Sequence, residues 1–441
     1  MGKKPDNGKG KPRLRDSLHV FQYRDFRLYF AGQLVSTVGS YMQSVALAWL
    51  VYRLTHSAVL LGAVVFAGQI PVFLLAPFCG LLADRVARRR IVLLCETTSM
   101  VLSSSLAFLT LAGRIQIWEI FAIGALSGTV NAFNFPARQA LIADLVKKED
   151  LIHAIPLNSS MINSARIAGP ALAGLVVAAI GEGWCFFVNA ASYIAVIAAL
   201  VMIKAQTRRM TLHAHSIFAN LKEGFSFAFR TGPDLALLVL LGVISFWGMR
   251  FDVLLPIFAD KILHGGPSAL GLLMGASGIG AVAASLALAA QNNIRDLGGW
   301  IALASGGFGI SLILFSVSHF LWLSIALLGL AGFTMVAQLD SSSTLLQEMV
   351  PDELRGRVTS IWTMMLTGIG PFGALITGAL AHQFGAVRTL AAGGTACVMG
   401  AMVFGFYLPI FRTRAIEMMG LPGGLASAAA PAADTPAQRG S

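Results

Sequence analysis

Long apolar runs alternate with short polar connections along almost the whole chain. A helix needs about 20 mostly apolar residues to cross a bilayer, and twelve runs come close to that length or exceed it. They lie near residues 27–52, 57–83, 91–112, 116–136, 155–180, 184–203, 235–259, 268–290, 299–317, 320–340, 358–381 and 387–411. The pattern predicts an all-α membrane protein with twelve transmembrane helices.

The polar segments predict how the chain is organised. Six runs fall in 26–203 and six in 235–411, and the polar segment 204–234 separates them. Apolar residues recur with helical spacing inside that segment, which predicts an amphipathic helix on the membrane surface. The basic segment 1–25 is expected to be a tail, and 412–441, rich in Ala, Gly and Pro, is expected to be disordered.

The two groups of six runs resemble each other. LTHSAVLLG (54–62) aligns with LHGGPSALG (263–271) at a shift of 209 residues. The segment 128–146 aligns with 332–350 at a shift of 204, and IAGP (167–170) matches GIGP (368–371). Two similar halves of six helices share one orientation. This arrangement is typical of transporters that bind their substrate between the halves.

The positive charges indicate the orientation. Of the 32 Lys and Arg residues, most lie in alternate connections and in the segments before and after the runs. The opposite connections hold Arg53, Arg114, Lys261 and Arg388. Because cytoplasmic loops carry the excess of Lys and Arg, we expect an inner (plasma) membrane protein with both termini and the linker in the cytoplasm. The net charge of +11 therefore reflects topology, and no nucleic-acid partner is expected.

The sequence lacks the common signatures of catalysis and cofactor binding. The four cysteines lie in or beside apolar runs without metal-ligand spacing, so no metal and no cofactor are expected. We find no P-loop, nucleophile elbow or HExxH pattern. These observations argue against an enzyme and against ATP-driven transport.

A charged hairpin follows the second run and reads CGLLADRVARRR (79–90). Gly80, Asp84, Arg85 and Arg88 resemble the loop motif of the major facilitator superfamily, although Ala87 stands where that family usually has Gly. The resemblance implies a gate in which these charges hold neighbouring helix ends when the carrier faces outward. Arginine suits carboxylates and backbone carbonyls, which fits that role. These charges could instead only set the topology.

The fifth run contains Arg166, Gly169, Pro170 and Gly174. They resemble the antiporter motif of drug-exporting facilitators. Small residues allow close helix approach and proline bends a helix, so the resemblance implies a hinge and a seal between the halves. Plain helix packing is the alternative.

Three longer segments resemble one subfamily. YRDFRLYFAGQLVSTVG (23–39), FPARQALIADLV (135–146) and VPDELRGRVTS (350–360) are similar to the facilitators that include the enterobactin exporter and macrolide-type efflux proteins. The resemblance implies efflux of a drug or siderophore by alternating access, and a monomer. Many drug/proton antiporters carry an Arg where this chain has Gly124, so proton coupling through that residue is unavailable.

Charges inside the runs are candidates for proton coupling, because a charge within the bilayer is costly. Asp252 is the first candidate, with Arg250 two residues before it. The alternatives are a permanent Asp252–Arg250 ion pair and an Asp252 exposed at the outer mouth. Glu96 and Asp340 lie near cytoplasmic ends of their runs, and Glu96 is expected to pair with a loop arginine.

Polar and aromatic residues within the runs could line a substrate cavity. The candidates are Gln43, Gln69, Asn131, Asn163, Trp247 and Phe251. Polar members could instead bond across helices, and aromatic members could face lipid or pack.

The pattern and the resemblance together predict a secondary active transporter. It would export a bulky amphipathic organic molecule by proton antiport with alternating access. Its partners would be this small-molecule substrate, protons and the lipid bilayer. The alternative is a facilitator-type importer of a metabolite.

Overall fold

A computed structural model describes residues 19–85, 87–204, 232–290, 297–350 and 352–418. Twelve helices in this part of the chain are long and apolar enough to cross a membrane. The predicted all-α fold with twelve spans is therefore confirmed. The predicted linker helix and most of both predicted tails lie outside the described residues.

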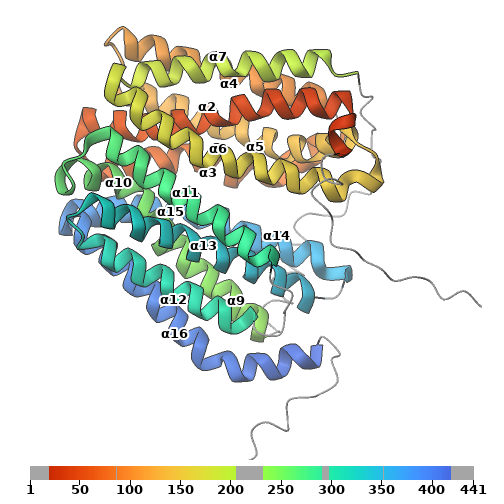
Figure 1. Cartoon of the computed structure of the whole chain (residues 1–441), viewed down its shortest axis with the longest axis vertical. Coiled ribbons are helices and arrows are strands. Elements are labelled where there is room, and N and C mark those ends of the chain that lie inside the picture. The colour runs from red at the N-terminus through yellow and green to blue at the C-terminus, as the bar shows by residue number, and fades with distance from the viewer. Residues whose placement is uncertain (1–18, 86, 205–231, 291–296, 351, 419–441) are drawn as a thin grey trace, which may run out of the picture.

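The first six spans form one bundle, drawn from red to yellow-green in Figure 1. Its helices are α2 (Arg24–Thr55), α3 (Ala58–Arg85), α4 (Arg88–Leu111), α5 (Ile117–Leu145), α6 (Leu151–Ile180) and α7 (Glu182–Met202), with the 3₁₀ helices η1 (His19–Gln22) and η2 (Lys148–Asp150). Helix α2 packs against α6 and α7, α3 packs against α5, and α4 packs against α5 and α7.

The last six spans form the second bundle, drawn from green to blue. Its elements are α9 (Gly232–Val243), η3 (Ile244–Gly248), η4 (Met249–Leu254), α10 (Leu255–Ile257), η5 (Phe258–Ile262), α11 (Gly266–Ala290), α12 (Leu297–Ser316), α13 (Leu321–Met349), α14 (Asp352–Gly368), α15 (Gly370–Phe384) and α16 (Ala386–Met418). Helix α13 packs against α11 and α12, and α12 packs against α16. Residues 412–418, expected in the tail, are helical.

Spans 7 and 11 are interrupted, which the apolar pattern does not predict. Span 7 passes from α9 through the π-helix η3, the 3₁₀ helix η4 and α10 into the π-helix η5. Span 11 breaks at Ile369, between α14 and α15, where Pro371 follows and supplies no N–H. Helix α6, by contrast, stays continuous through Pro156 and Pro170.

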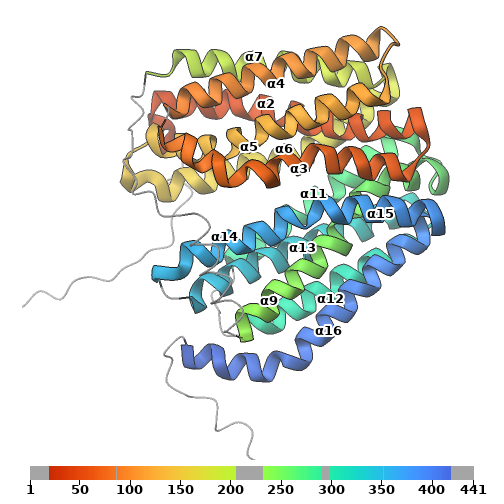
Figure 2. The same cartoon turned by 180° about the vertical axis from the view of Figure 1, so that it is seen from behind.

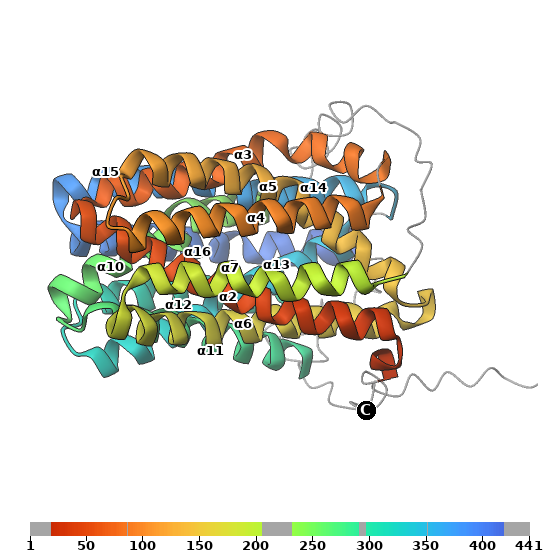
Figure 3. The same cartoon turned by 90° about the horizontal axis from the view of Figure 1, so that it is seen from above.

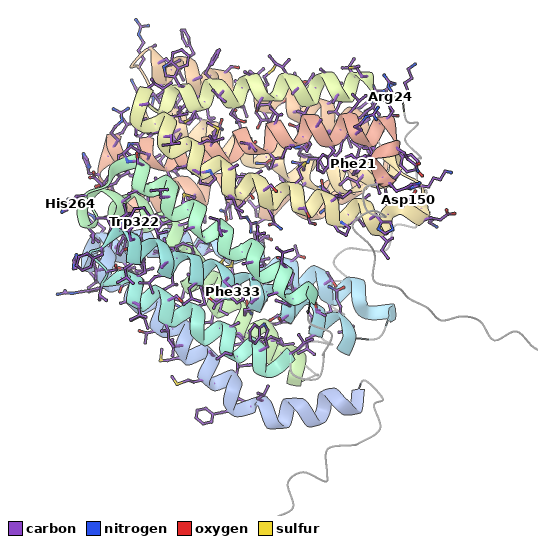
Figure 4. All side chains as sticks on the ribbon, viewed as in Figure 1. Phe21, Arg24, Asp150, His264, Trp322 and Phe333 are labelled. Carbon is purple, nitrogen blue, oxygen red and sulfur yellow. The ribbon has the colours of Figure 1, made fainter. Side chains whose placement is uncertain are left out.

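The two bundles lie side by side, and their ribbons diverge toward one end (Figures 1 and 2). We call this the linker end, since α7 finishes there and α9 starts there. Arg24 and Asp150 lie at the linker end, and His264 and Trp322 lie at the opposite end, called the far end (Figure 4). Seen from above, the helices run between these two ends (Figure 3). Helices α6 and α11, and helices α3 and α15, make the main contacts between the bundles.

Candidate substrate site between the two halves

At the far end the two halves touch through hydrogen bonding and close backbone contact. The Tyr52 hydroxyl of α2 donates to Asp260 Oδ2 of η5 over 2.8 Å. Gly62 of α3 lies directly against the backbone carbonyl of Ala374 in α15. A hydrogen bond and a glycine contact thus link different helix pairs across the interface.

The predicted antiporter motif lies in α6 between α2 and α11. Gly169 is buried against Tyr41, and a Cβ built on it would lie 3.0 Å from the Val38 carbonyl oxygen. A Cβ on Gly174 would lie 3.0 Å from the Gly271 Cα. The motif glycines therefore permit α6 to approach both α2 in its own half and α11 in the other half.

Arg166 in the first half and Asp340 in the second half attract each other electrostatically. The Arg166 Nε lies 3.5 Å from the Tyr41 hydroxyl, at the outer limit of a hydrogen bond. Asp340 of α13 is exposed, accepts from Ser285 Oγ over 3.2 Å and is attracted by Arg166. Among the described residues, Arg166 and Asp340 thus attract each other at the α6–α11–α13 side of the interface without forming an ion pair.

Arg250 lies at the other side of the interface, beside α3 and α15. Its Nη1 donates to Gln69 Oε1 of α3 over 3.4 Å, and its guanidinium covers Gly370 at the break in span 11. Asp252 is half-buried, and its Oδ1 accepts from the backbone N–H of Val253 over 2.9 Å. Arg250 therefore connects the interrupted spans 7 and 11 with the other half.

The charged hairpin holds helix ends within the first half. Arg88 is buried, pairs with Asp144 Oδ1 at 3.1 Å and donates to the Ala140 carbonyl. Arg89 donates to the carbonyls of Leu200 and Val201, at 2.6 and 2.9 Å. These contacts satisfy carbonyls at the end of α7, which have no partners within the helix.

The surroundings of three residues of the hairpin motif lie outside the described part of the chain. Gly80, Asp84 and Arg85 belong to the last turns of α3, but their side chains lie outside the described part of the chain. The expected gating contacts of Asp84 and Arg85 therefore stay predictions.

Glu96 lies inside the first half, in a polar cluster of α2, α4 and α5. Its side chain is 1% exposed and accepts from Asn134 Nδ2 over 3.1 Å. The charge that attracts it is Arg138, an arginine that the sequence predicts in a loop and that lies in α5. With its amide oxygen turned toward Arg138, Gln33 accepts from Nη2 at 3.0 Å and from Nη1 at 3.3 Å.

Arg138 is the main residue that the sequence analysis missed. The apolar run ends near residue 136 and so predicts Arg138 in a loop, whereas α5 continues to Leu145. The spacing was available as a signal, because Arg138 follows Asn134 by one helical turn and so shares its face.

The predicted cavity residues fall into different environments. Gln69 contacts the other half, as described above. Gln43 Oε1 accepts from Ser103 Oγ and from Asn189 Nδ2, both at 2.8 Å, and so bonds across helices of its own half. Asn131 is exposed on α5, and Asn163 is half-buried on α6.

The two aromatic cavity candidates lie in the second half. Phe251 is 6% exposed and packs edge-on against Phe308, with ring centroids 6.3 Å apart. Trp247 is half-buried and packs against Phe246, with centroids 5.1 Å apart. Phe251 thus belongs to the core of its own half. No group of three or more metal-ligating side chains occurs within the described ranges.

Comparison with known proteins identifies the family. The family described as a transmembrane secretion effector matches residues 16–422 of this 441-residue chain. The chain belongs to this family. It is therefore a multi-pass membrane transporter and not an enzyme, and the resemblance to major facilitators inferred from its motifs is confirmed.

Several curated relatives cover most of this transmembrane secretion effector. The Staphyloferrin A transporter of Staphylococcus aureus (strain NCTC 8325 / PS 47) is 28% identical over 86% of this chain and 95% of the relative. The Enterobactin exporter EntS of Shigella boydii serotype 4 (strain Sb227) is 24% identical over 87% and 90%. The Multidrug efflux pump Tap of Mycolicibacterium fortuitum is 23% identical over 88% and 96%.

Solved structures share the fold at low identity. A bacterial homolog of the human lysosomal transporter Spinster, in an inward-facing and unoccupied conformation, matches with a TM-score of 0.67 and 13% identity. The match covers 91% of this chain and 98% of that one. A POT family transporter matches with a TM-score of 0.68 and 11% identity, over 88% and 96%. Both are transporters of the predicted fold.

Proposed function

We propose that this transporter exports a bulky amphipathic organic molecule, a drug or a siderophore, by proton antiport with alternating access. It would act in the plasma membrane, with both termini and the linker in the cytoplasm. An enterobactin exporter and a multidrug efflux pump among its relatives support export. The segments 26–203 and 235–411 would be the two bodies that move.

The observation that carries the proposal is the asymmetry between the two ends. The halves contact each other at the far end through Tyr52–Asp260 and the glycine contacts, while their ribbons diverge toward the linker end. The positive charges favour a cytoplasmic linker end, and with that orientation this conformation would take its substrate from the cytoplasm. The antiporter glycines 169 and 174 and Pro170 would then seal the far end.

Two carboxylates are candidate proton carriers. We rank Asp340 first, because it is exposed and an arginine of the other half attracts it. Asp252, the first candidate from the sequence, comes second here, because its Oδ1 already accepts a backbone hydrogen bond. Glu96 is enclosed within the first half, so we assign it a structural role.

The hairpin motif would act as a gate on the cytoplasmic side. Gly80, Asp84 and Arg85 would engage the second half when the linker end closes. Arg88 would hold the hairpin to α5, because it already pairs with Asp144.

The test uses inverted membrane vesicles with an imposed pH gradient and a panel of siderophores and hydrophobic drugs. We expect substrate to trigger proton release in wild type and in Glu149→Gln, an exposed control at the linker end, but not in Asp340→Asn. Loss in Asp252→Asn with retention in Asp340→Asn would reverse the ranking. Absence of proton movement with every compound would contradict antiport.

The direction needs a separate measurement. Labelled compounds would be followed in inverted and in right-side-out vesicles. Export predicts accumulation in inverted vesicles. Accumulation only in right-side-out vesicles would indicate the facilitator-type importer instead.

A further inference from the structure

We infer that Arg250 binds an acidic oxygen of the transported molecule, in a carboxylate or a catecholate. This inference rests on the proposed function, because it names the chemical class of the substrate. It concerns the place where the interrupted spans 7 and 11 meet α3 of the other half.

The guanidinium of Arg250 is buried and poorly satisfied. Arg250 is 8% exposed, and its Nε is buried without a hydrogen-bond partner. The bond to Gln69 is long, at 3.4 Å. A buried polar group without a partner costs free energy, and an arginine keeps its charge in a protein. A residue of this kind inside a membrane is a functional candidate.

Among the residues that the structure describes, no carboxylate lies within ion-pair distance of Arg250. The ion pairs among the described residues are Arg53–Glu182 and Arg88–Asp144. Asp252 attracts Arg250 but does not come within ion-pair distance, and its Oδ1 accepts from Val253. The charge of Arg250 is therefore available to a ligand.

The backbone around Arg250 makes room for the guanidinium. A Cβ on Gly370 would lie 2.8 Å from Nη2 and 3.1 Å from Cζ, so this position in the break of span 11 accommodates the group because it has no side chain. The π-helix η3 and the 3₁₀ helix η4 meet next to Arg250. Such interruptions of a helix are frequent at functional sites.

The first half has a glycine at the matching position but no charge beside it. Gly169 lies against the Cβ of Tyr41, whereas Gly370 lies against the guanidinium of Arg250. Tyr41 and Arg250 correspond at the shift of 209, and Gly169 and Gly370 lie before the matched prolines. The scaffold therefore does not require an arginine at this position.

The chemistry of the guanidinium selects the ligand. Its planar donors match the two oxygens of a carboxylate, and can equally meet the adjacent oxygens of a catecholate. Gln69 contributes an amide from the other half. An acidic group bound here would contact both halves of the transporter.

The test measures binding to the purified full-length transporter in nanodiscs, without a pH gradient. The probes are amphipathic carboxylates and catechols with fluorescent labels, each paired with its neutral methyl ester or ether. The variants are Arg250→Gln, Arg250→Lys and Gly370→Ala. Arg388→Gln removes an equal charge from an exposed far-end site and serves as the matched control.

We expect wild type and Arg388→Gln to prefer the acid over its neutral partner by roughly tenfold to a hundredfold, the usual effect of a hydrogen bond to a charged group. Arg250→Gln should lose this preference, and Arg250→Lys should retain part of it. Gly370→Ala should weaken acid binding without unfolding the protein, because its new methyl group displaces only the flexible end of Arg250.

The outcomes separate this inference from the proposed function. Equal binding of acids and neutral partners to wild type would overturn the inference. So would an acid preference that survives in Arg250→Gln, or an absence of acid binding when neutral or cationic drugs are exported. Acid binding that depends on Arg250, without gradient-driven export in vesicles, would support the inference and contradict the proposed function.

Discussion

The two halves share a scaffold but differ in what they bury near the linker end. Helices α5 and α13 begin at 117 and 321 and end at 145 and 349, so both ends are 204 residues apart. By this shift Asn134 corresponds to Gln338 and Arg138 to Ser342. The first half therefore has a charge at a position where the second half has a hydroxyl.

Helices α4 and α12 extend the comparison. They begin at Arg88 and Leu297, a shift of 209, so Glu96 corresponds to Ser305. Ser305 is fully buried and bonds to the Ile301 carbonyl of its own helix. Gln338 Oε1 and Ser341 Oγ are buried without hydrogen-bond partners. Charged contacts join three helices in the first half, whereas the matching polar groups of the second half bond locally or lack partners.

The interrupted helices also distinguish the two halves. Spans 1 and 5 are the continuous helices α2 and α6, while their counterparts, spans 7 and 11, are interrupted. We infer that the first half moves as a rigid body and that the second half supplies the deformable helices. We make four predictions, from the largest expected effect to the smallest: two compare the halves directly, the third concerns the contact between them, and the fourth a contact within the first half.

The largest effect is expected at the buried cluster. Arg138→Met removes the charge that attracts Glu96 and the donor to Gln33, and leaving a buried charge uncompensated costs about 3 kcal/mol. Ser342→Ala, the matched change in the second half, should cost under about 1 kcal/mol, since it removes a single neutral hydrogen bond. Thermal unfolding in detergent measures both, and equal losses would contradict the comparison.

The next largest effect is a difference in stability between alanine substitutions at Gly169 and at Gly370, the glycines before the matched prolines. The methyl group of Gly169→Ala would meet the backbone of α2, which cannot move freely, so we expect a loss of about 1–3 kcal/mol. Gly370→Ala meets only the end of Arg250 and should unfold close to the wild-type temperature. Gly405→Ala, in open space, is the control for the substitution itself. A larger loss in Gly370→Ala than in Gly169→Ala would refute a rigid first half.

A smaller effect is expected where the halves meet at the far end. Tyr52→Phe removes the hydrogen bond to Asp260, worth about 1 kcal/mol. The population with an open far end should rise roughly fivefold. Labelling of a cysteine introduced at the far end would report this change, with Tyr407→Phe, an exposed tyrosine, as the control. Unchanged labelling would mean that Tyr52 does not hold this end closed.

The smallest effect concerns the contact of Tyr23, the residue directly before α2, with η2. The Tyr23 hydroxyl donates to Asp150 Oδ2 over 2.6 Å, and this bond raises the pKa of Tyr23 above its ordinary 10.0. A raised pKa stabilises the fold below pH 10.0, and this contribution disappears as the pH rises through the shifted value. Wild type should therefore be slightly more stable than Tyr23→Phe at neutral pH, and the difference should vanish in strong alkali. A difference independent of pH would assign it to packing.

The sequence predicts the spans and the repeat because both depend on patterns that the bilayer imposes. Twelve apolar runs are visible since each must cover the hydrocarbon core. The matched IAGP and GIGP segments locate Gly169 and Gly370 before any contact is known. These features are local in the chain and do not depend on which helices become neighbours.

The remaining features depend on which helices pack against each other, so the pattern of the sequence does not predict them. Hydropathy ends a span where charge begins, so it places Arg138 in a loop although α5 carries it into a buried cluster. The sequence shows that Gln43 is polar, but it does not show whether this side chain faces a cavity or another helix. The interruptions next to Arg250 arise in an apolar run whose residues suit a continuous helix.

The glycine contacts of the far end have a consequence for how fast that end can reopen. Gly62 rests on the Ala374 carbonyl, and Gly174 and Gly271 rest on each other's helix backbone. When such glycine–backbone surfaces separate or rejoin, no long side chain has to change its rotamer. Ordering a long side chain costs up to about 2 kcal/mol of conformational entropy, and contacts of this kind would avoid that cost whenever the far end closed in alternating access.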